Sequence, residues 1–389
     1  MNTAIQKGSW YELFSRYAED LYPGRYTAAF CRELEEKAHL ITSLAKEKHS
    51  HTVAHNYLYP EFHEIAALTG DSLALSVFAK RKQAIRVDFG GVFFMGATAK
   101  IIAGDRTQVF VQDNPEAIGC SLVSGTSYEW IELWKKKYPD GILVSYINSD
   151  AYIKSISDYI GTSRNTDKVI AHAVKNNPGK KILVLPDKFL GFVMKSRALT
   201  LLEQEDVRID SDLIEVYQYS HNGFHASCYV HELIGNEAID QALLEHPEAE
   251  LMIHPECGCA SSCLYKLNAG LIPHTKAYFL STDQMIDVAR SSPAQKFIVA
   301  TEKGMIYKLR KEVPNKTFVP VSDKAECRFM KANTLDKLMR SLTEDRIEIV
   351  LCNDCCDPKK PYQNDRVIHI QRSVAKKAKQ AIDKMLTIY

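Results

Sequence analysis

The sequence repeats one order of strands and helices three times, and each copy closes on a cysteine. Each copy starts with an apolar strand that ends in polar residues, continues with a small hydroxyl residue ahead of a helix, and then alternates further strands with helices. The closing cysteines are Cys120, Cys228 and Cys327, which follow one another at similar intervals. Alternating strands and helices are typical of a parallel sheet covered by helices. We therefore predict an α/β fold built from three homologous domains.

The repeats also set the expected domain boundaries. The predicted parts are a helical N-terminal extension over 1–45, α/β repeats over 46–128, 129–235 and 236–340, and a C-terminal tail and helix over 341–389. Each repeat is long enough for one three-layer α/β/α domain. Ligands of such sheets bind beyond the carboxyl ends of the strands. A pseudo-threefold arrangement brings the strand ends of all three domains to one central active site, and we expect that arrangement.

Polar residues stand at or just after the predicted strand ends. They are His55, Tyr57, Tyr146, Asn148, His231, His254 and Glu256. Imidazole, phenol, amide and carboxylate groups supply hydrogen-bond donors, acceptors and acid–base capacity. This set indicates a site that binds a polar substrate and moves protons.

Each repeat also places one small hydroxyl residue ahead of a predicted helix, namely Ser72, Ser163 and Thr282. In one interpretation each is an N-cap whose oxygen accepts a hydrogen bond from an amide of the first turn. In the other, three helix N-termini converge and bind the carboxylate or phosphate groups of a small polyanion. The residues alone leave both interpretations open.

Three cysteines delivered to one centre suggest a metal centre. Three thiolates suit a catalytic zinc ion with an open fourth position. They equally suit a 4Fe–4S cluster in which one iron lacks a protein ligand and acts as a Lewis acid. The alternative is that they are small buried apolar side chains, but their matching places in the repeat favour a shared ligand.

The remaining cysteines fall outside the repeat. Cys31 reads as structural, and the other six form two groups: Cys257, Cys259 and Cys263 in an extended linker of the third repeat, and Cys352, Cys355 and Cys356 in the tail. Together the two groups could supply four thiolates to a structural zinc ion or a second cluster. Alternatively, either group forms a redox switch on the main site, or all six are plain surface thiols.

Composition narrows the classes of function. Lys plus Arg is 49 and Asp plus Glu is 48, a net charge of +1, which argues against a nucleic-acid partner. No run of about 18 apolar residues is present, so no membrane-spanning helix is expected. The first residues lead into no apolar segment, so we expect no signal peptide and a cytoplasmic protein. Because disulfides are disfavoured there, clustered cysteines suggest metal or redox chemistry.

The motifs of residues 50–340 resemble the quinolinate synthase family and keep its order. They are Ala54-His55-Asn56-Tyr57 with Pro60-Glu61, Gly70-Asp71-Ser72-Leu73, Phe94-Met95 with Thr98-Ala99-Lys100, Tyr146-Ile147-Asn148-Ser149, Thr162-Ser163, Pro186-Asp187, Cys228-Tyr229-Val230-His231, His254-Pro255-Glu256-Cys257, Ser281-Thr282, Thr301-Glu302, and Cys327 with Met330-Lys331. The resemblance implies three α/β domains with pseudo-threefold symmetry. It also implies condensation of iminoaspartate with dihydroxyacetone phosphate to quinolinate, with loss of phosphate and water, for NAD biosynthesis. The iminoaspartate implies functional coupling to an aspartate-oxidising enzyme.

The resemblance also implies roles for individual residues. It gives a 4Fe–4S cluster held by Cys120, Cys228 and Cys327, and acid–base roles for Tyr57, Tyr146 and Glu256. The residues implied as substrate binders are His55, Ser72, Asn148, Ser163, His231, His254 and Thr282.

The chain departs from the family pattern in three segments. Ala97 stands where the family usually has Glu, Leu58 where a Gln is common, and residues 222–227 lack the frequent Trp and Gly. These departures, with the extra cysteines, keep a rival function open, namely a non-catalytic or redox-sensing metal-binding homologue. A zinc lyase that uses the same three thiolates is a further alternative.

Overall fold

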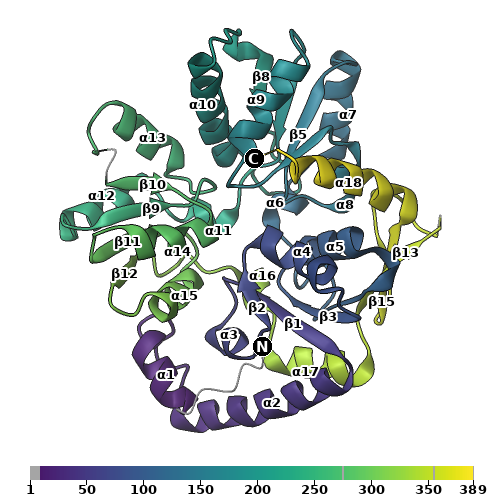
Figure 1. The fold of residues 1–389 in the computed structure, drawn as a ribbon, viewed down its shortest axis with the longest axis vertical. Coiled ribbons are helices and arrows are strands. Elements are labelled where there is room, and N and C mark those ends of the chain that lie inside the picture. Colours follow the sequence, from purple (N-terminus) through teal and green to yellow (C-terminus); the bar gives the residue numbers. More distant parts are fainter. Residues whose placement is uncertain (1–8, 274–275, 354, 389) are drawn as a thin grey trace.

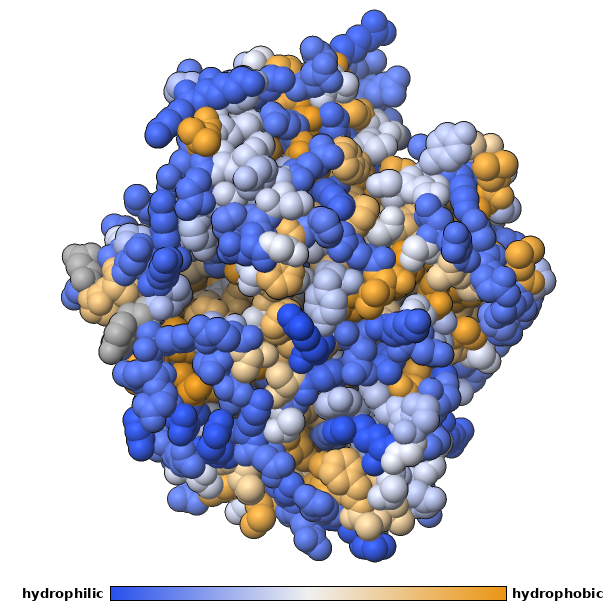
Figure 2. Space-filling view, turned by 180° about the vertical axis from the view of Figure 1, so that it is seen from behind, coloured by the Kyte–Doolittle hydropathy of each residue, from blue (hydrophilic) through white to orange (hydrophobic). Residues whose placement is uncertain are grey.

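The protein is an α/β structure with three separate sheets, flanked by helices (Figure 1). The computed structural model describes residues 9–273, 276–353 and 355–388. Residues 1–7, over which the sequence predicts no signal peptide, lie outside the described residues. In the described part of the chain, no helix is both long and apolar enough to cross a membrane. Hydrophilic residues cover most of the face shown in Figure 2, with apolar residues visible between them.

Each sequence repeat forms four parallel strands, and the three sets have the same spatial order, with the second strand outside the first. The first set has the order β2-β1-β3-β4 and consists of β1 (Ser50–His55), β2 (Leu68–Gly70), β3 (Arg86–Gly90) and β4 (Gln108–Val111). The second set has the order β6-β5-β7-β8 and consists of β5 (Ile142–Tyr146), β6 (Tyr159–Gly161), β7 (Ile182–Leu185) and β8 (Ile214–Val216). The third set has the order β10-β9-β11-β12 and consists of β9 (Glu250–Ile253), β10 (Ala277–Phe279), β11 (Lys296–Ala300) and β12 (Thr317–Pro320).

The central strands are buried apolar segments, as expected for parallel strands covered on both faces. All five residues of β3 and all five of β5 are buried. The strands β2, β6 and β10 have only three residues each and were not predicted from the sequence. Each of them pairs with the first strand of its repeat, for example Val53 with Leu68. Three residues are too few to show the alternation of a strand in the sequence, so these strands are recognised only by their pairing with a neighbouring strand.

Helices follow the strands and cover the sheets. In the first and second repeats they are α3 (Pro60–Ile65), α4 (Ser72–Lys82), α5 (Phe93–Ala103), α6 (Ser121–Ser124), α7 (Tyr128–Lys137), α8 (Ala151–Ile156), α9 (Thr166–Asn176) and α10 (Lys188–Gln204). Helix α11 (Tyr229–Glu232) ends the second repeat. In the third repeat the helices are α12 (Asn236–Glu245), α13 (Ala260–Asn268), α14 (Thr282–Ser291), α15 (Gly304–Glu312) and α16 (Arg328–Lys331), and α17 (Leu335–Glu344) spans its end. The extended linker of the third repeat therefore contains a helix, α13, as the shorter linkers of the other repeats do. Short 3-10 turns occur at Gly104–Arg106 and Ser211–Leu213.

The two ends of the chain are packed onto the repeats. The predicted helical preface forms α1 (Trp10–Tyr17) and α2 (Ala28–Glu47), and Cys31 is buried in α2. The C-terminal tail extends the first sheet to seven strands, an addition that the sequence did not indicate. Strand β13 (Glu348–Cys352) pairs antiparallel with β4, β15 (Val367–Gln371) pairs parallel with β13, and β14 (Tyr362–Gln363) forms the edge. The predicted C-terminal helix is α18 (Arg372–Met385), which is amphipathic and lies against α8 (Figure 1).

Candidate functional site

One cavity collects the polar strand ends of all three repeats. Every catalytic, binding and metal residue predicted from the sequence lines it: His55, Tyr57, Ser72, Cys120, Tyr146, Asn148, Ser163, Cys228, His231, His254, Glu256, Thr282 and Cys327. The three short helices that follow the cysteines, α6, α11 and α16, lie near the middle of the molecule (Figure 1). Residues far apart in the sequence thus share one enclosed environment.

The three cysteines occupy the same local structure. Cys120, Cys228 and Cys327 each stand immediately before a four-residue helix, in extended backbone. Burial raises the pKa of the Cys120 thiol to about 12 and that of Cys327 to about 11, and it raises the pKa of Cys228 well above its usual value. The negative charge that each thiolate presents to its neighbours adds to this rise for Cys120 and Cys228. Three adjacent thiolates therefore need a cationic group among them to be stable.

Glu256 is the centre of a buried polar network. Its Oε1 accepts a hydrogen bond of 2.9 Å from Nδ2 of Asn148, and it also hydrogen-bonds with Tyr146. Nδ1 of His231 lies 3.3 Å from Oε2 without the alignment of a hydrogen bond, and Nδ1 of His254 lies 3.6 Å away. Burial raises the pKa of Glu256 to about 7, against the opposing effect of its two hydrogen-bond donors. A carboxyl group in this range can both accept and donate a proton at neutral pH.

The histidines and tyrosines of the cavity are uncharged. Burial lowers the pKa of His55 and of His231 to about 3 and lowers that of His254 well below its usual value. Burial also raises the pKa of Tyr57 and of Tyr146 well above the ordinary phenol value. Neutral imidazoles and phenols can each donate and accept hydrogen bonds. The cavity therefore offers neutral hydrogen-bonding groups around the carboxyl of Glu256 and three thiols.

The hydroxyl residues are not N-caps, so the first interpretation of Ser72, Ser163 and Thr282 is wrong. Asp71 caps α4 and Ser281 caps α14, which leaves Ser72 and Thr282 as the first residues of those helices. Ser163 precedes the cap position of α9, which Asn165 occupies. The Ser72 hydroxyl instead donates to Oδ1 of Asn148 at 3.2 Å, a contact between the first and second repeats.

Glu302 and Lys331 form a buried ion pair beside Cys327. Both residues belong to the sequence motifs, but the sequence predicted no role for them. Nζ of Lys331 lies 3.1 Å from Oε1 of Glu302, and the two side chains are 5% and 0% exposed. Lys331 also donates to the carbonyl of Tyr57, and Glu302 accepts from the backbone N–H of Cys327 at 3.3 Å. A Cβ on Gly304 would lie 2.7 Å from Oε2 of Glu302 and 2.9 Å from Nζ of Lys331, so glycine makes room for the pair. The pair joins the first and third repeats at the cavity wall.

Thr301 was also missed as a site residue, although its segment belongs to the motifs. Its Oγ1 lies 2.6 Å from the hydroxyl of Tyr57 and 3.1 Å from Nε2 of His231. Thr301 is buried directly after β11 and so links the phenol of the first repeat to the imidazole that follows Cys228. Its partners are distant in sequence, so no local pattern reveals it.

Comparison with known proteins decides the family. Residues 39–387 match the family described as Quinolinate synthetase A protein. The chain is 36% identical to a quinolinate synthase of Pyrobaculum aerophilum over 346 residues, which cover 89% of this chain and 97% of the relative. It is 35% identical to a quinolinate synthase of Thermus thermophilus over 354 residues, 91% of this chain and 98% of the relative. This chain belongs to the quinolinate synthase family.

The departures from the family pattern lie in distinct places. Ala97 does not line the central cavity but faces a second cavity of about 410 Å³, which shares Phe94, Gly119 and Cys120 with the first. Leu58 is buried beneath Gly90, where a Cβ would approach its side chain to 2.7 Å. Both departures thus lie outside the lining of the central cavity, which includes every predicted site residue.

The two extra cysteine groups do not meet, so a single site built from both is wrong. Cys257 and Cys259 form a disulfide just before α13, with Cys263 buried in that helix. Cys352 and Cys355 form a disulfide after β13, and α13 and β13 lie on opposite sides of the molecule (Figure 1). The sulfur atoms of Cys352, Cys355 and Cys356 lie within 4.8 Å of one another, close enough for this group to hold a metal ion by itself.

Proposed function

We propose that this chain is a quinolinate synthase that condenses iminoaspartate with dihydroxyacetone phosphate and releases phosphate and water. The observation that carries the proposal is the cavity in which Cys120, Cys228 and Cys327 meet Glu256. Family membership supports the same reaction, since the relatives from Pyrobaculum and Thermus are named quinolinate synthases. The proposal places the protein in the cytoplasm, in NAD biosynthesis, next to an enzyme that oxidises aspartate.

A pseudo-threefold arrangement of three α/β/α domains around the cavity forms part of the proposal. Its support is the common strand order of the three repeats and the common position of their cysteines before short helices. In this arrangement each domain contributes one thiol and the polar ends of its first strand. No one domain could perform the chemistry without the other two.

The donor set of the cavity fits a 4Fe–4S cluster. Cys120, Cys228 and Cys327 supply three thiols and leave one iron without a protein ligand, and thiolates are the usual ligands of such clusters. The raised pKa values of the thiols fit as well, because the charge of the cluster iron replaces the protons that burial otherwise retains. When bound, the cluster supplies Lewis acidity for the loss of water.

The side chains of the cavity divide into binders and proton carriers. His55, Ser72, Asn148, Ser163, His231, His254 and Thr282 bind the substrates. Their neutral donors can hold carboxylate and phosphate oxygens while the cavity excludes bulk water. Tyr57, Tyr146 and Glu256 move protons during enolisation, condensation and dehydration, and Glu256 takes the largest share because its pKa of about 7 suits both directions of transfer.

The test is quinolinate formation by full-length protein purified without oxygen, measured together with its iron and sulfide content. Glu256→Gln should lower kcat by about 10²–10⁴-fold while the iron content stays that of the wild type. Glu237→Gln, at an exposed position of α12, is the matched control and should change neither quantity. An unchanged kcat in Glu256→Gln would remove this carboxyl from the mechanism.

The rival function is a metal-binding or redox-sensing homologue without turnover, which the disulfide of Cys352 and Cys355 favours. Iron and sulfide without quinolinate would support that rival. Zinc in place of iron at the three central thiols would instead support a zinc lyase.

A further inference from the structure

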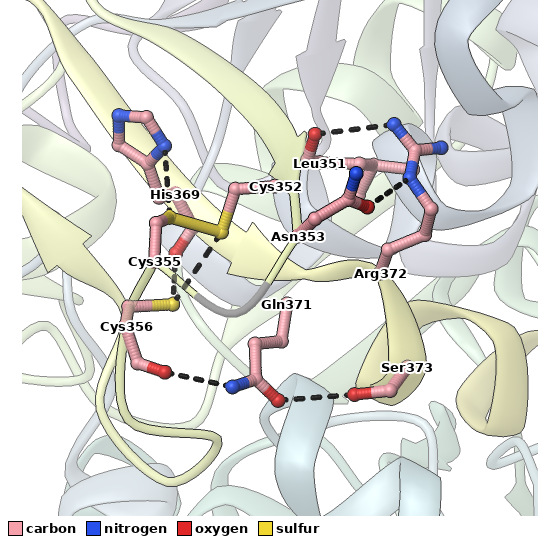
Figure 3. The surroundings of a disulfide bond; sticks show 9 residues. All are labelled: Leu351, Cys352, Asn353, Cys355, Cys356, His369, Gln371, Arg372 and Ser373. Carbon is pink, nitrogen blue, oxygen red and sulfur yellow. Dashed lines mark hydrogen bonds between the residues drawn. A yellow bond between two sulfur atoms is a disulfide. The ribbon is translucent and has the colours of Figure 1, made fainter.

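The C-terminal cysteines form a compact group with one histidine (Figure 3). Cys352 ends β13, Cys355 and Cys356 lie in the loop that follows, and His369 belongs to the neighbouring strand β15. The two strands are paired in parallel, with Val350 opposite His369, so their side chains stay in register. This group takes no part in the function proposed above.

Two of the distances between donor atoms match the edges of a tetrahedral metal site. His369 contacts Cys355 but lies outside the group of three sulfur atoms that are all within 4.8 Å of one another, so its ring completes the site after a local shift. With bonds of about 2.3 Å to sulfur and about 2.0–2.1 Å to nitrogen, two sulfur ligands of zinc lie about 3.8 Å apart, and sulfur and nitrogen about 3.5 Å apart. Sγ of Cys352 and Sγ of Cys356 are 3.7 Å apart, and Sγ of Cys355 lies 3.4 Å from Nδ1 of His369. The sulfur atoms of Cys352 and Cys355 are closer together than two zinc ligands would be, because a disulfide joins them.

The surroundings orient the ligands. The side-chain amide of Gln371 donates to the carbonyl of Cys356 at 2.8 Å, and Ser373 donates to the oxygen of the same amide at 3.0 Å. The guanidinium of Arg372 donates to Oδ1 of Asn353 at 3.1 Å and to the carbonyl of Leu351 at 3.3 Å (Figure 3). Such outer contacts hold a loop in the geometry that metal ligands require.

We propose that Cys352, Cys355, Cys356 and His369 bind one structural zinc ion in the thiol form of the protein. Three thiolates and one imidazole complete a tetrahedral site with no open position, which is the coordination of structural zinc. Binding releases the three thiol protons to solvent and changes no oxidation state. Zinc and the disulfide use the same two sulfur atoms, so one protein molecule holds one or the other.

The zinc ion would fix one wall of the second cavity. Cys356, His369 and the loop residues Asp357–Pro361 line this cavity together with Cys120 of the central site. Lys359 of the same loop pairs with Glu132 of α7 at 2.6 Å. The four ligands therefore connect the tail to the region beside the central thiols, where Ala97 lines the same cavity.

Zinc and iron content of the full-length protein tests the proposal, in protein made with both metals and purified without oxygen. The wild type should carry one zinc ion per chain in addition to iron. Cys356→Ser and His369→Ala should lose the zinc and keep the iron of the wild type. Cys263→Ala is the matched control, a cysteine of the other extra group, and should keep both metals. The zinc measurement is independent of quinolinate formation, so its result stands whether or not the proposed function holds.

Titration of the reduced, zinc-free wild type with cobalt(II) guards against misfolded variants. A thiolate-to-cobalt charge-transfer band that saturates at one equivalent supports the site. Three results overturn the proposal: no metal uptake by the reduced wild type, zinc that is lost in Cys263→Ala but kept in Cys356→Ser, or iron in place of zinc at this group.

Discussion

The central and the C-terminal cysteine groups assemble in opposite ways. Cys120, Cys228 and Cys327 come from three repeats, and the packing of three sheets brings them to one cavity. Cys352, Cys355 and Cys356 lie within five positions of one another at the end of one strand. The central group depends on contacts between distant parts of the chain, whereas the C-terminal group depends on one loop and two paired strands.

This difference indicates where a substitution should have long-range effects. Around the central group, buried contacts join the repeats, such as Tyr57 to Thr301 and Asn148 to Glu256. Around the C-terminal group, the contacts involve exposed side chains such as Arg372 with Asp105. A substitution near the central group should therefore lower both stability and activity. A substitution near the C-terminal group should affect only the structure around it.

The largest expected effect tests this contrast directly. Cys120→Ser, Cys228→Ser and Cys327→Ser should each abolish quinolinate formation, because a thiolate ligand is lost and the hydroxyl that replaces it is a poor ligand for iron. Each variant should also lose most of its iron. Iron analysis and quinolinate assay of protein purified without oxygen measure both quantities.

Cys31→Ser is the control for the central series, since Cys31 is a buried free cysteine of α2 that does not line the cavity. Cys355→Ser is the peripheral counterpart and should retain iron and quinolinate formation. Full activity in any of the three central variants would contradict the convergence of the repeats on one metal centre.

The second effect concerns the buried pair that ties the first repeat to the third. Lys331→Met should lower the free energy of unfolding by about 3–5 kcal/mol, because it leaves the buried carboxylate of Glu302 without its cationic partner. It should also lower activity, since Lys331 holds the carbonyl of Tyr57. Denaturant unfolding measures the stability change.

Lys359→Met is its counterpart in the tail and removes an exposed pair with Glu132. Exposed pairs contribute little to stability, so this variant should unfold at the denaturant concentration of the wild type. Equal losses of stability in Lys331→Met and Lys359→Met would contradict the expected difference between the central and the C-terminal region.

Much of the fold was predictable from sequence because buried parallel strands are short apolar runs followed by polar residues. β5 and β11 are examples, and the same logic placed Tyr146 and Glu256 at the cavity. Strand β6 was missed because three residues carry no period, and β13 because its choice of β4 as a partner is made by packing. The local composition of a strand does not show which other strand it pairs with.

The errors in the site have the same origin. Ser72 was assigned as a possible cap one position too late, because Asp71 and Ser72 are both good N-caps and only the backbone decides between them. Thr301 was overlooked because its partners come from other repeats. One of the alternatives for the extra cysteines joined both groups in one site, although their elements lie far apart (Figure 1). The spacing of residues along the chain shows which residues occupy matching positions in the three repeats. It does not show which residues outside that pattern contact one another in the fold.

The smallest expected effect concerns a pair of acids where the first and third repeats touch. Asn56 donates to Oδ1 of Asp283 at 3.3 Å, and burial together with the nearby carboxylate of Asp71 raises the pKa of Asp283 from 3.8 to about 6. The folded protein thus holds a proton that the unfolded chain releases. This proton favours the folded state below about pH 4, and its contribution is lost as the pH rises through about 6.

Asp283→Asn should therefore stabilise the protein at pH 7 by about 1–3 kcal/mol and flatten the fall in stability between about pH 4 and 7. The amide keeps an oxygen that can accept from Asn56 while it removes the charge next to Asp71. Glu237→Gln, at an exposed position of α12, is the control and should leave the profile unchanged. Unfolding midpoints from about pH 4 to 8 measure the effect. If Asp283→Asn destabilises the protein at pH 7, the contact between the repeats needs this charge, and the centre is held together by ion pairing rather than by neutral hydrogen bonds.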